Sequence, residues 1–150
     1  MVLYRIAKHI YADDLSGTGA RLYGGRWNSE GKAAVYLASS RALAVLEVLV
    51  HLPPLLIPSD FCIIEVEVPD NNIYNLPMAD LPANWKDISQ PVALRKIGDE
   101  FLKKGDHLMM KIPSAIVPEE FNFLLNPQHS DAKKIKLLKK DTFNFDERLI

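Results

Sequence analysis

Cysteine is nearly absent from this sequence, which contains Cys62 alone. A single thiol excludes an intramolecular disulfide framework and a cysteine-rich zinc site. Long apolar runs are also missing, because no window approaches the ~20 apolar residues that a membrane span needs. The first residues, Met1–Arg5, lack the apolar core of a signal peptide. We therefore expect a cytoplasmic protein with no membrane partner.

An excess of either charge is missing too. The formal net charge is -1, so no global field attracts nucleic acid. The four histidines do not fall at metal-ligand spacing, and the sequence has no Walker loop, no dinucleotide fingerprint and no Gly-x-Ser-x-Gly elbow. We therefore expect no direct contact with nucleic acid, no metal and no serine-hydrolase nucleophile.

What is present is a balanced composition, with 48% hydrophobic and 25% charged residues in a chain of 150. This balance is typical of one globular domain, which we place at residues 1–150. The predicted strands are Tyr4–Ile10, Ala33–Ala38, Phe61–Val68, Leu108–Ile112, Ser114–Val117, Asn122–Leu125 and Ile135–Phe145. Many strands with two or three helices predict an α/β domain of the α+β type, with a mixed curved sheet and flanking helices.

Two helices are predicted between these strands. The first begins at a cap on Ser39 or Ser40 and runs to about Leu52, before Pro53-Pro54; the second covers Pro91–Lys104, before Gly105. The first helix is apolar almost all round, so we expect it to be buried on most sides. Phe61–Val68 alternates, which predicts a half-exposed strand. The glycine-rich stretch Asp13–Asn28 is expected to be an ordered loop and Asn71–Trp85 an irregular segment.

Glu47 is the most informative single residue. It is the only charged residue between Arg41 and His51, inside a helix that we expect to be buried. An unpaired buried carboxylate is costly, so it must be paired, protonated or facing a cavity. Its spacing from His51 also allows a structural contact within the helix. The pattern alone leaves a structural role and a site role equally open.

Three further residues are candidates for a site. Arg26 lies in the string Tyr23-Gly24-Gly25-Arg26-Trp27-Asn28, where its planar guanidinium suits an anionic ligand, although a surface arginine stacked on an aromatic ring fits as well. Arg5 and Arg21 are rivals for that role. Tyr36 lies in the middle of a strand and, by itself, is typical of a core or interface residue. Ser114, after Pro113, is interpreted as a hydrogen-bonding serine.

Several long strings of this sequence resemble one known family. They are collinear and extend from about Tyr4 to Phe145: Tyr11–Asn28, Val35–Ala38, Leu43–Leu52, Pro113–Glu120 and Asn122–Pro127. These strings are similar to the RES-domain family, which is named for an arginine, a glutamate and a serine. Those residues correspond to Arg26, Glu47 and Ser114, and Tyr36 matches the family's site tyrosine.

The resemblance implies a function and partners. RES proteins are similar in fold to ADP-ribosyltransferase toxins and deplete NAD⁺, and each is encoded beside an antitoxin with an Xre-like helix-turn-helix part. The expectations that follow are a toxin with NAD⁺ as its substrate, inorganic phosphate as an optional co-substrate, no prosthetic group, an Xre-like antitoxin as partner and a homodimer within that complex.

The chemistry of NAD⁺ cleavage suits these residues. Nicotinamide is a cationic leaving group, and the transition state resembles an oxocarbenium ion. We expect Glu47 to stabilise that charge, Arg26 to hold the pyrophosphate, Tyr36 to frame nicotinamide or ribose and Ser114 to bind substrate or orient the other groups. The acceptor is water, phosphate or a protein side chain. The alternatives are an ADP-ribosyltransferase that modifies a protein and a catalytically inactive interaction module.

Overall fold

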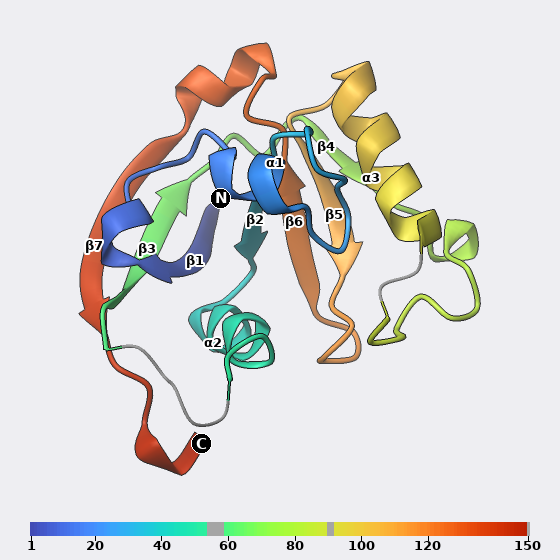
Figure 1. Ribbon diagram of the computed structural model, residues 1–150. Coiled ribbons are helices and arrows are strands. Elements are labelled where there is room, and N and C mark those ends of the chain that lie inside the picture. Colours follow the sequence, from blue (N-terminus) through green and yellow to red (C-terminus); the bar gives the residue numbers. More distant parts are fainter. Residues whose placement is uncertain (54–58, 90–91, 150) are drawn as a thin grey trace.

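The computed structural model describes residues 1–53, 59–89 and 92–149, which form a curved mixed sheet with helices around it (Figure 1). The strand order is β4-β5-β6-β2-β1-β3-β7, and only β4 and β5 pair in parallel. The strands are β1 (Val2–Lys8), β2 (Val35–Ala38), β3 (Phe61–Glu67), β4 (Ile73–Asn75), β5 (Met109–Pro113), β6 (Phe121–Leu125) and β7 (Lys136–Phe143). The helices are α1 (Thr18–Tyr23), α2 (Arg41–Leu49) and α3 (Val92–Lys104), with 3₁₀ turns η1 (His9–Tyr11), η2 (Met78–Asp80), η3 (Ser130–Lys134) and η4 (Glu147–Leu149). The α+β prediction is confirmed.

The sheet divides between β1 and β2. These strands share one register pair, Tyr4 with Ala38, whereas β1 and β3 pair along the whole of β1. The sheet therefore has two halves, β4-β5-β6-β2 and β1-β3-β7, which are joined at this pair and separate beyond it. One core cluster combines both halves, with Leu3, Ile64 and Val66 from one and Val35, Leu37 and Phe123 from the other. Because strand side chains alternate, the opposite faces carry separate clusters, one packed on α3 and one on α2.

The helix that carries Glu47 begins where its sequence predicts. Ser40 is the N-cap and its hydroxyl accepts a hydrogen bond from the Leu43 N–H at 3.1 Å. The helix ends at Leu49, before the predicted end at Leu52. The prediction that it is buried on most sides is wrong, because only Leu43 and Ala44 are buried. Of its remaining apolar residues, Ala42 is exposed and the others are half-exposed, since one flank of the helix borders an open cleft.

Two further predictions, one of a loop and one of a strand, are also wrong. The stretch Asp13–Asn28 contains α1, a short helix with no buried residue and so no apolar periodicity; glycines with positive φ, Gly17 and Gly24, flank it. The predicted strand Ser114–Val117 is instead the turn between β5 and β6, closed by a hydrogen bond from the Ser114 N–H to the Glu120 carbonyl.

Other boundaries differ in smaller ways. The prediction that Phe61–Val68 is a half-exposed strand is wrong for the first half of β3, because Phe61 and Ile63 are buried in the cluster under α2. The segment expected to be irregular contains the short strand β4 and the turn η2. Gly105, with a φ of 64°, follows α3 as predicted. Pro54, expected just after the first helix, and Pro91, the predicted start of the second, lie outside the described residues.

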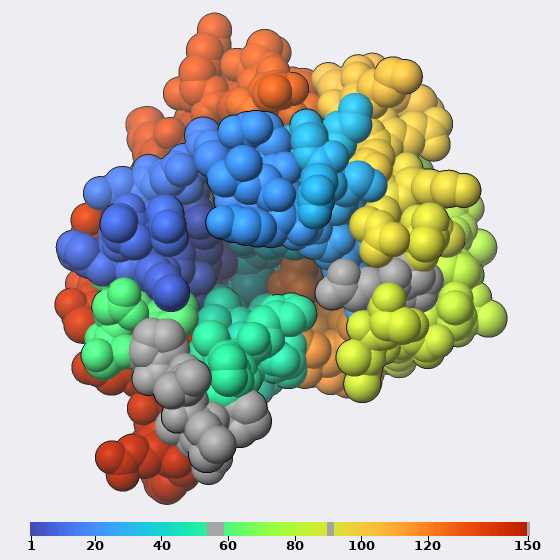
Figure 2. Space-filling view, viewed as in Figure 1, coloured from blue at the N-terminus to red at the C-terminus, as the bar shows by residue number. Residues whose placement is uncertain are grey.

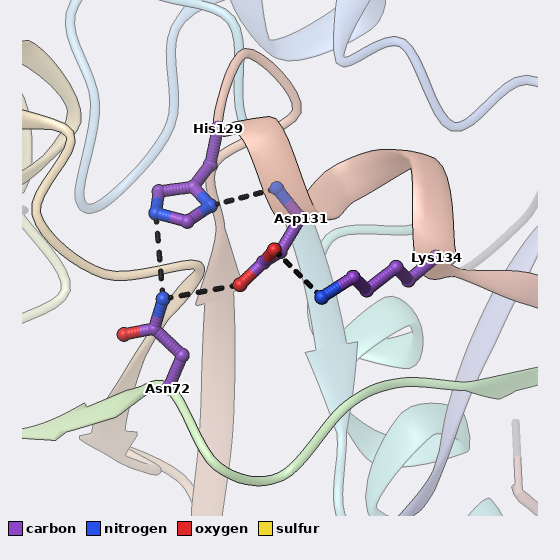
Figure 3. A network of polar contacts seen from close by, with 4 residues as sticks. All are labelled: Asn72, His129, Asp131 and Lys134. Carbon is purple, nitrogen blue, oxygen red and sulfur yellow. Dashed lines mark hydrogen bonds and ion pairs between the residues drawn. The ribbon is translucent and has the colours of Figure 1, made fainter.

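A polar network fastens the segment after β6 to the loop before β4 (Figure 3). The side-chain amide of Asn72 lies 3.4 Å from His129 Nε2 and donates to Asp131 Oδ2 at 3.4 Å. His129 Nδ1 accepts from the Asp131 N–H at 3.0 Å, and Lys134 pairs with Asp131 at 3.1 Å. The hydrogen bonds from Lys134 and Asn72 lower the pKa of the Asp131 carboxyl.

Across the described ranges, no helix is long and apolar enough to cross a membrane.

Candidate active site

A cleft of about 1340 Å³ opens where β1 and β2 diverge. Figure 2 shows it as a hollow between the segment that contains α1 and the helix α2. Arg26, Tyr36 and Glu47 line this cleft, although they lie on a turn, a strand and a helix. Ser114 is not part of the lining and is 2% exposed. The volume exceeds the roughly 300–1,000 Å³ that most ligand sites occupy, so a ligand of dinucleotide size is accommodated.

Glu47 is held by two neutral donors. Its Oε1 accepts a hydrogen bond from Ser114 Oγ at 2.8 Å and another from Asn122 Nδ2 at 2.7 Å. No ion pair to Glu47 exists among the residues that the structure describes, and the anticipated contact with His51 is not formed there. The carboxylate is therefore held by two neutral donors without a direct ion pair to a described residue, with the charge of Arg26 acting on it from a greater distance, and it faces the cleft half-exposed.

Ser114 has no hydrogen-bonding capacity left for a ligand. Its Oγ accepts from the backbone N–H groups of Ile116 and Val117, each at 3.1 Å, and donates its proton to Glu47. A hydroxyl has one donor and two acceptor sites, and all three are used. Of the two roles expected for Ser114, this geometry supports the orientation of Glu47.

Tyr36 holds the turn that carries Arg26. Its hydroxyl donates to Asn28 Oδ1 at 2.6 Å and accepts from the Trp27 N–H at 3.0 Å. Burial raises the pKa of the Tyr36 phenol well above its ordinary value, so it stays a neutral donor. A Cβ on Gly25 would lie 2.7 Å from the Tyr36 hydroxyl oxygen, so this close approach requires glycine. The ring of Tyr36 borders the cleft while its hydroxyl serves the turn.

Asn28 is a site-supporting residue that residue patterns alone did not single out. It is fully buried, and its Nδ2 donates to the carbonyls of Ala20 and Lys32 at 2.9 and 3.0 Å. Together with the bond from Tyr36, these contacts fix the turn between α1 and β2. Asn122, the second donor to Glu47, was missed as well. Both residues lie inside the strings that carry the family resemblance, which is the one signal that points to them.

Arg26 is hydrogen-bonded to the segment after η2. Its Nη1 donates to the Asp87 carbonyl at 3.0 Å and its Nη2 to the Trp85 carbonyl. Its Nε is buried and has no partner in the described part of the chain. Burial lowers the pKa of the Arg26 guanidinium, and the negative charges of Glu47 and Asp87 oppose that shift. The group remains a cation, because arginine is not deprotonated in proteins.

The rival arginines differ in their placement. Arg5 of β1 lines the cleft, and its Nη1 donates to the Asp14 carbonyl at 2.6 Å. Burial lowers the pKa of the Arg5 guanidinium, and the Asp14 carboxylate opposes that effect. Arg21 is exposed and does not line the cleft. The cleft lining therefore includes the cations Arg5 and Arg26 and the carboxylate of Glu47, beside the charged residues Lys8, Asp14, Glu30 and Arg95. Within residues 1–53, 59–89 and 92–149, no group of histidine, cysteine and acidic side chains is arranged to hold a metal.

These features define a class of protein: a small α+β domain built around one ligand cleft, with charged side chains from several elements converging on it. The RES domain family model matches residues 2–146. The chain therefore belongs to the RES-domain toxin family.

The relatives span nearly the whole chain. The protein called Toxin Res of Photorhabdus laumondii subsp. laumondii is 41% identical over 152 residues, which cover 100% of this chain and 97% of the relative. The protein called Prs ADP-ribosylating toxin of a Sphingobium species is 43% identical over 149 residues, covering 96% and 91%. The crystal structure of the M. tuberculosis MbcT–MbcA toxin–antitoxin complex contains a similar fold, with a TM-score of 0.78 and 20% identity over 95% of this chain and 83% of that chain.

Proposed function

We propose that this chain is a toxin that cleaves NAD⁺ between nicotinamide and ribose. The observation that carries the proposal is the carboxylate of Glu47, which hydrogen bonds from Ser114 and Asn122 hold on the wall of the cleft. Arg26 and Arg5 line the same cleft. A ligand with an anionic pyrophosphate and a centre that becomes cationic matches both signs of charge. The names of the relatives support the proposal, because ADP-ribosylation breaks this same bond.

The bond that breaks joins C1′ of the ribose to the ring nitrogen of nicotinamide. Its electron pair goes to the nitrogen, so nicotinamide departs as a neutral molecule and positive charge develops on the ribose. Glu47 stabilises that charge, as a preorganised carboxylate does in other glycosyl cleavages. An oxygen of the acceptor then bonds to C1′ and loses its proton to solvent.

The other site residues have supporting roles in this proposal. Arg26 supplies positive charge for the pyrophosphate, with Nε as the donor that the protein does not use. Tyr36 frames the nicotinamide or the ribose with its ring, and Ser114 orients Glu47. No prosthetic group takes part. Water, inorganic phosphate and a protein side chain remain alternative acceptors; the Sphingobium relative's name favours the last as the second candidate.

One incubation tests the reaction and its acceptor together. Purified, partner-free protein is mixed with NAD⁺, with and without inorganic phosphate, and the products are identified by mass. We expect release of nicotinamide, with ADP-ribose if water accepts and its phosphate ester if phosphate accepts. Retention of label from NAD⁺ on a macromolecule would identify an ADP-ribosyltransferase. Unchanged NAD⁺ after long incubation with folded protein contradicts the proposal.

The proposal includes a partner. We expect an Xre-like helix-turn-helix antitoxin to cover the cleft, because unchecked loss of NAD⁺ stops growth, and we expect two copies of the toxin in the complex. Production of the chain alone should arrest a bacterial culture, and co-production with the neighbouring gene's product should restore growth and yield a stable complex whose mass reports the stoichiometry. Glu47→Gln serves as the inactive control. Normal growth of cells that contain the folded, unpartnered wild-type chain contradicts the toxin role.

A further inference from the structure

Asn122 lies where its side chain can act on Glu47. It belongs to β6, pairs in register with Ala38 of β2 and Ile112 of β5, and lines the cleft. Its neighbours in the strand, Phe121 and Phe123, point to the other face because strand side chains alternate. The side chain of Asn122 therefore projects to the face on which Tyr36 and α2 lie, and its Nδ2 is 2.7 Å from Glu47 Oε1.

Both donors to Glu47 contact the same oxygen. Ser114 Oγ and Asn122 Nδ2 share Oε1, and Ser114 is itself fixed by two backbone N–H groups. Oε2 accepts no hydrogen bond and forms no ion pair within the described portion of the chain. The two oxygens of one carboxylate thus differ: Oε1 is engaged by the protein, and Oε2 is left for whatever occupies the cleft.

The amide orientation of Asn122 follows from chemistry. A carboxylate oxygen can only accept, so the atom that faces Glu47 must be the NH₂ group and not the carbonyl oxygen. A glutamate side chain has several rotatable bonds and explores many positions when it is free. Two donors that converge on one oxygen from different elements, the β5–β6 turn and β6, select one of those positions.

We infer that Asn122 is a positioning residue that, together with Ser114, holds Glu47 Oε1 and so presents Oε2 to the ligand. The inference rests on the proposed function, which supplies NAD⁺ as the substrate. What it adds is a role for Asn122 and a different role for each oxygen of Glu47. Asn122 acts through Glu47. Its loss should therefore lower kcat and leave KM nearly unchanged, because the substrate is still bound while the carboxylate is misplaced.

The test compares two variants at Asn122 with a matched control. Asn122→Ala removes the donor, and we expect kcat to fall about 10-fold or more, toward the roughly 100-fold that a misplacement of about 1 Å can cost. Asn122→Asp places a carboxyl group beside Glu47, and two such groups share one proton. The protonated pair retains a donor to Oε1, so the kcat of this variant should approach that of the wild type at mildly acidic pH and fall away from it as the pH rises and the shared proton is lost.

The control is Asn126→Ala, at the position that directly follows the same strand. Asn126 is 3% exposed, donates to the Leu102 carbonyl at 3.2 Å and does not line the cleft. It should lower the melting temperature without changing the pH profile of kcat. Melting curves of all variants correct each kcat for the folded fraction.

Two outcomes overturn the inference: wild-type kcat in folded Asn122→Ala, or an Asn122→Asp profile that parallels the wild type at every pH. Failure of the proposed function is distinguishable, since it is seen in the wild-type chain. If the wild type does not consume NAD⁺ but arrests growth, the same variants are compared by growth arrest at equal amounts of soluble protein. Full arrest by Asn122→Ala then overturns the inference, and reduced arrest supports it.

Discussion

Glu47→Gln is expected to lower NAD⁺ turnover by about 100-fold or more while the protein keeps its stability. Glutamine retains an oxygen that accepts from Ser114 and Asn122, so the clamp survives and only the negative charge is lost. The melting temperature should stay the same or rise, because a partly buried charge has been removed and Glu47 has no ion pair within the described residues. Turnover and melting temperature are measured on one preparation.

The matched control is Glu65→Gln in β3. Glu65 is paired with Arg41 outside the cleft lining, so its charge should not affect the developing cation. Turnover of this variant should stay close to that of the wild type. If Glu47→Gln lowers the melting temperature and leaves turnover nearly normal, Glu47 is a structural partner. In that event the proposed mechanism fails.

Gly98→Ala adds one methyl group where α3 packs on the turn that carries Arg26, and we expect this substitution to destabilise the protein strongly. A Cβ at this position in α3 would lie 1.6 Å from the carbonyl oxygen of Trp27, so helix and turn must separate. Overpacking against backbone costs about 3 kcal/mol or more, which corresponds to a fall in melting temperature of roughly 6–12 °C. The bond from the Ser29 N–H to Asp99, 2.8 Å long, should be lost with it.

The same displacement moves the turn that carries Arg26, so turnover per folded molecule should also fall. Gly19→Ala is the comparison for stability. A Cβ on Gly19 meets no atom within 4 Å, and alanine favours the helix α1. This variant should melt at the wild-type temperature or slightly above it. Equal melting temperatures for Gly98→Ala and the wild type would show that α3 is not packed on the turn as described.

Local signals in the sequence are enough to place several elements. The cap at Ser40 locates the start of α2, and Gly105 locates the end of α3, because each depends on a side chain or a φ angle at one residue. The strand β2 follows from its apolar run. The helix α1 and the turn after β5 could not be predicted in this way. The helix α1 buries no residue and so lacks apolar periodicity. The segment after β5 has an apolar sequence like that of a strand, but it forms the turn of the hairpin between β5 and β6.

The site shows the same division. Glu47 stands out because a charge in an apolar helix needs a reason, and the structure brings it into one cleft with Arg26 and Tyr36. Asn28 and Asn122 carry no comparable signal. The role of an asparagine can be recognised only when its burial and its hydrogen-bond partners are known. Both depend on how segments far apart in the chain pack together. Asn122 and Glu47 are 75 residues apart.

The single register pair between β1 and β2 has a consequence for ligand recognition. Beyond Tyr4 and Ala38, the facing margins of these central strands pair with no other strand among the residues that the structure describes. Residues of both strands line the cleft, so we expect peptide donors and acceptors on these margins to be open to a ligand. A ligand that lies between the strands can bind the main chain itself. Contacts of that kind do not depend on which side chains the strands carry, so replacement of side chains along the cleft leaves part of the binding surface unchanged.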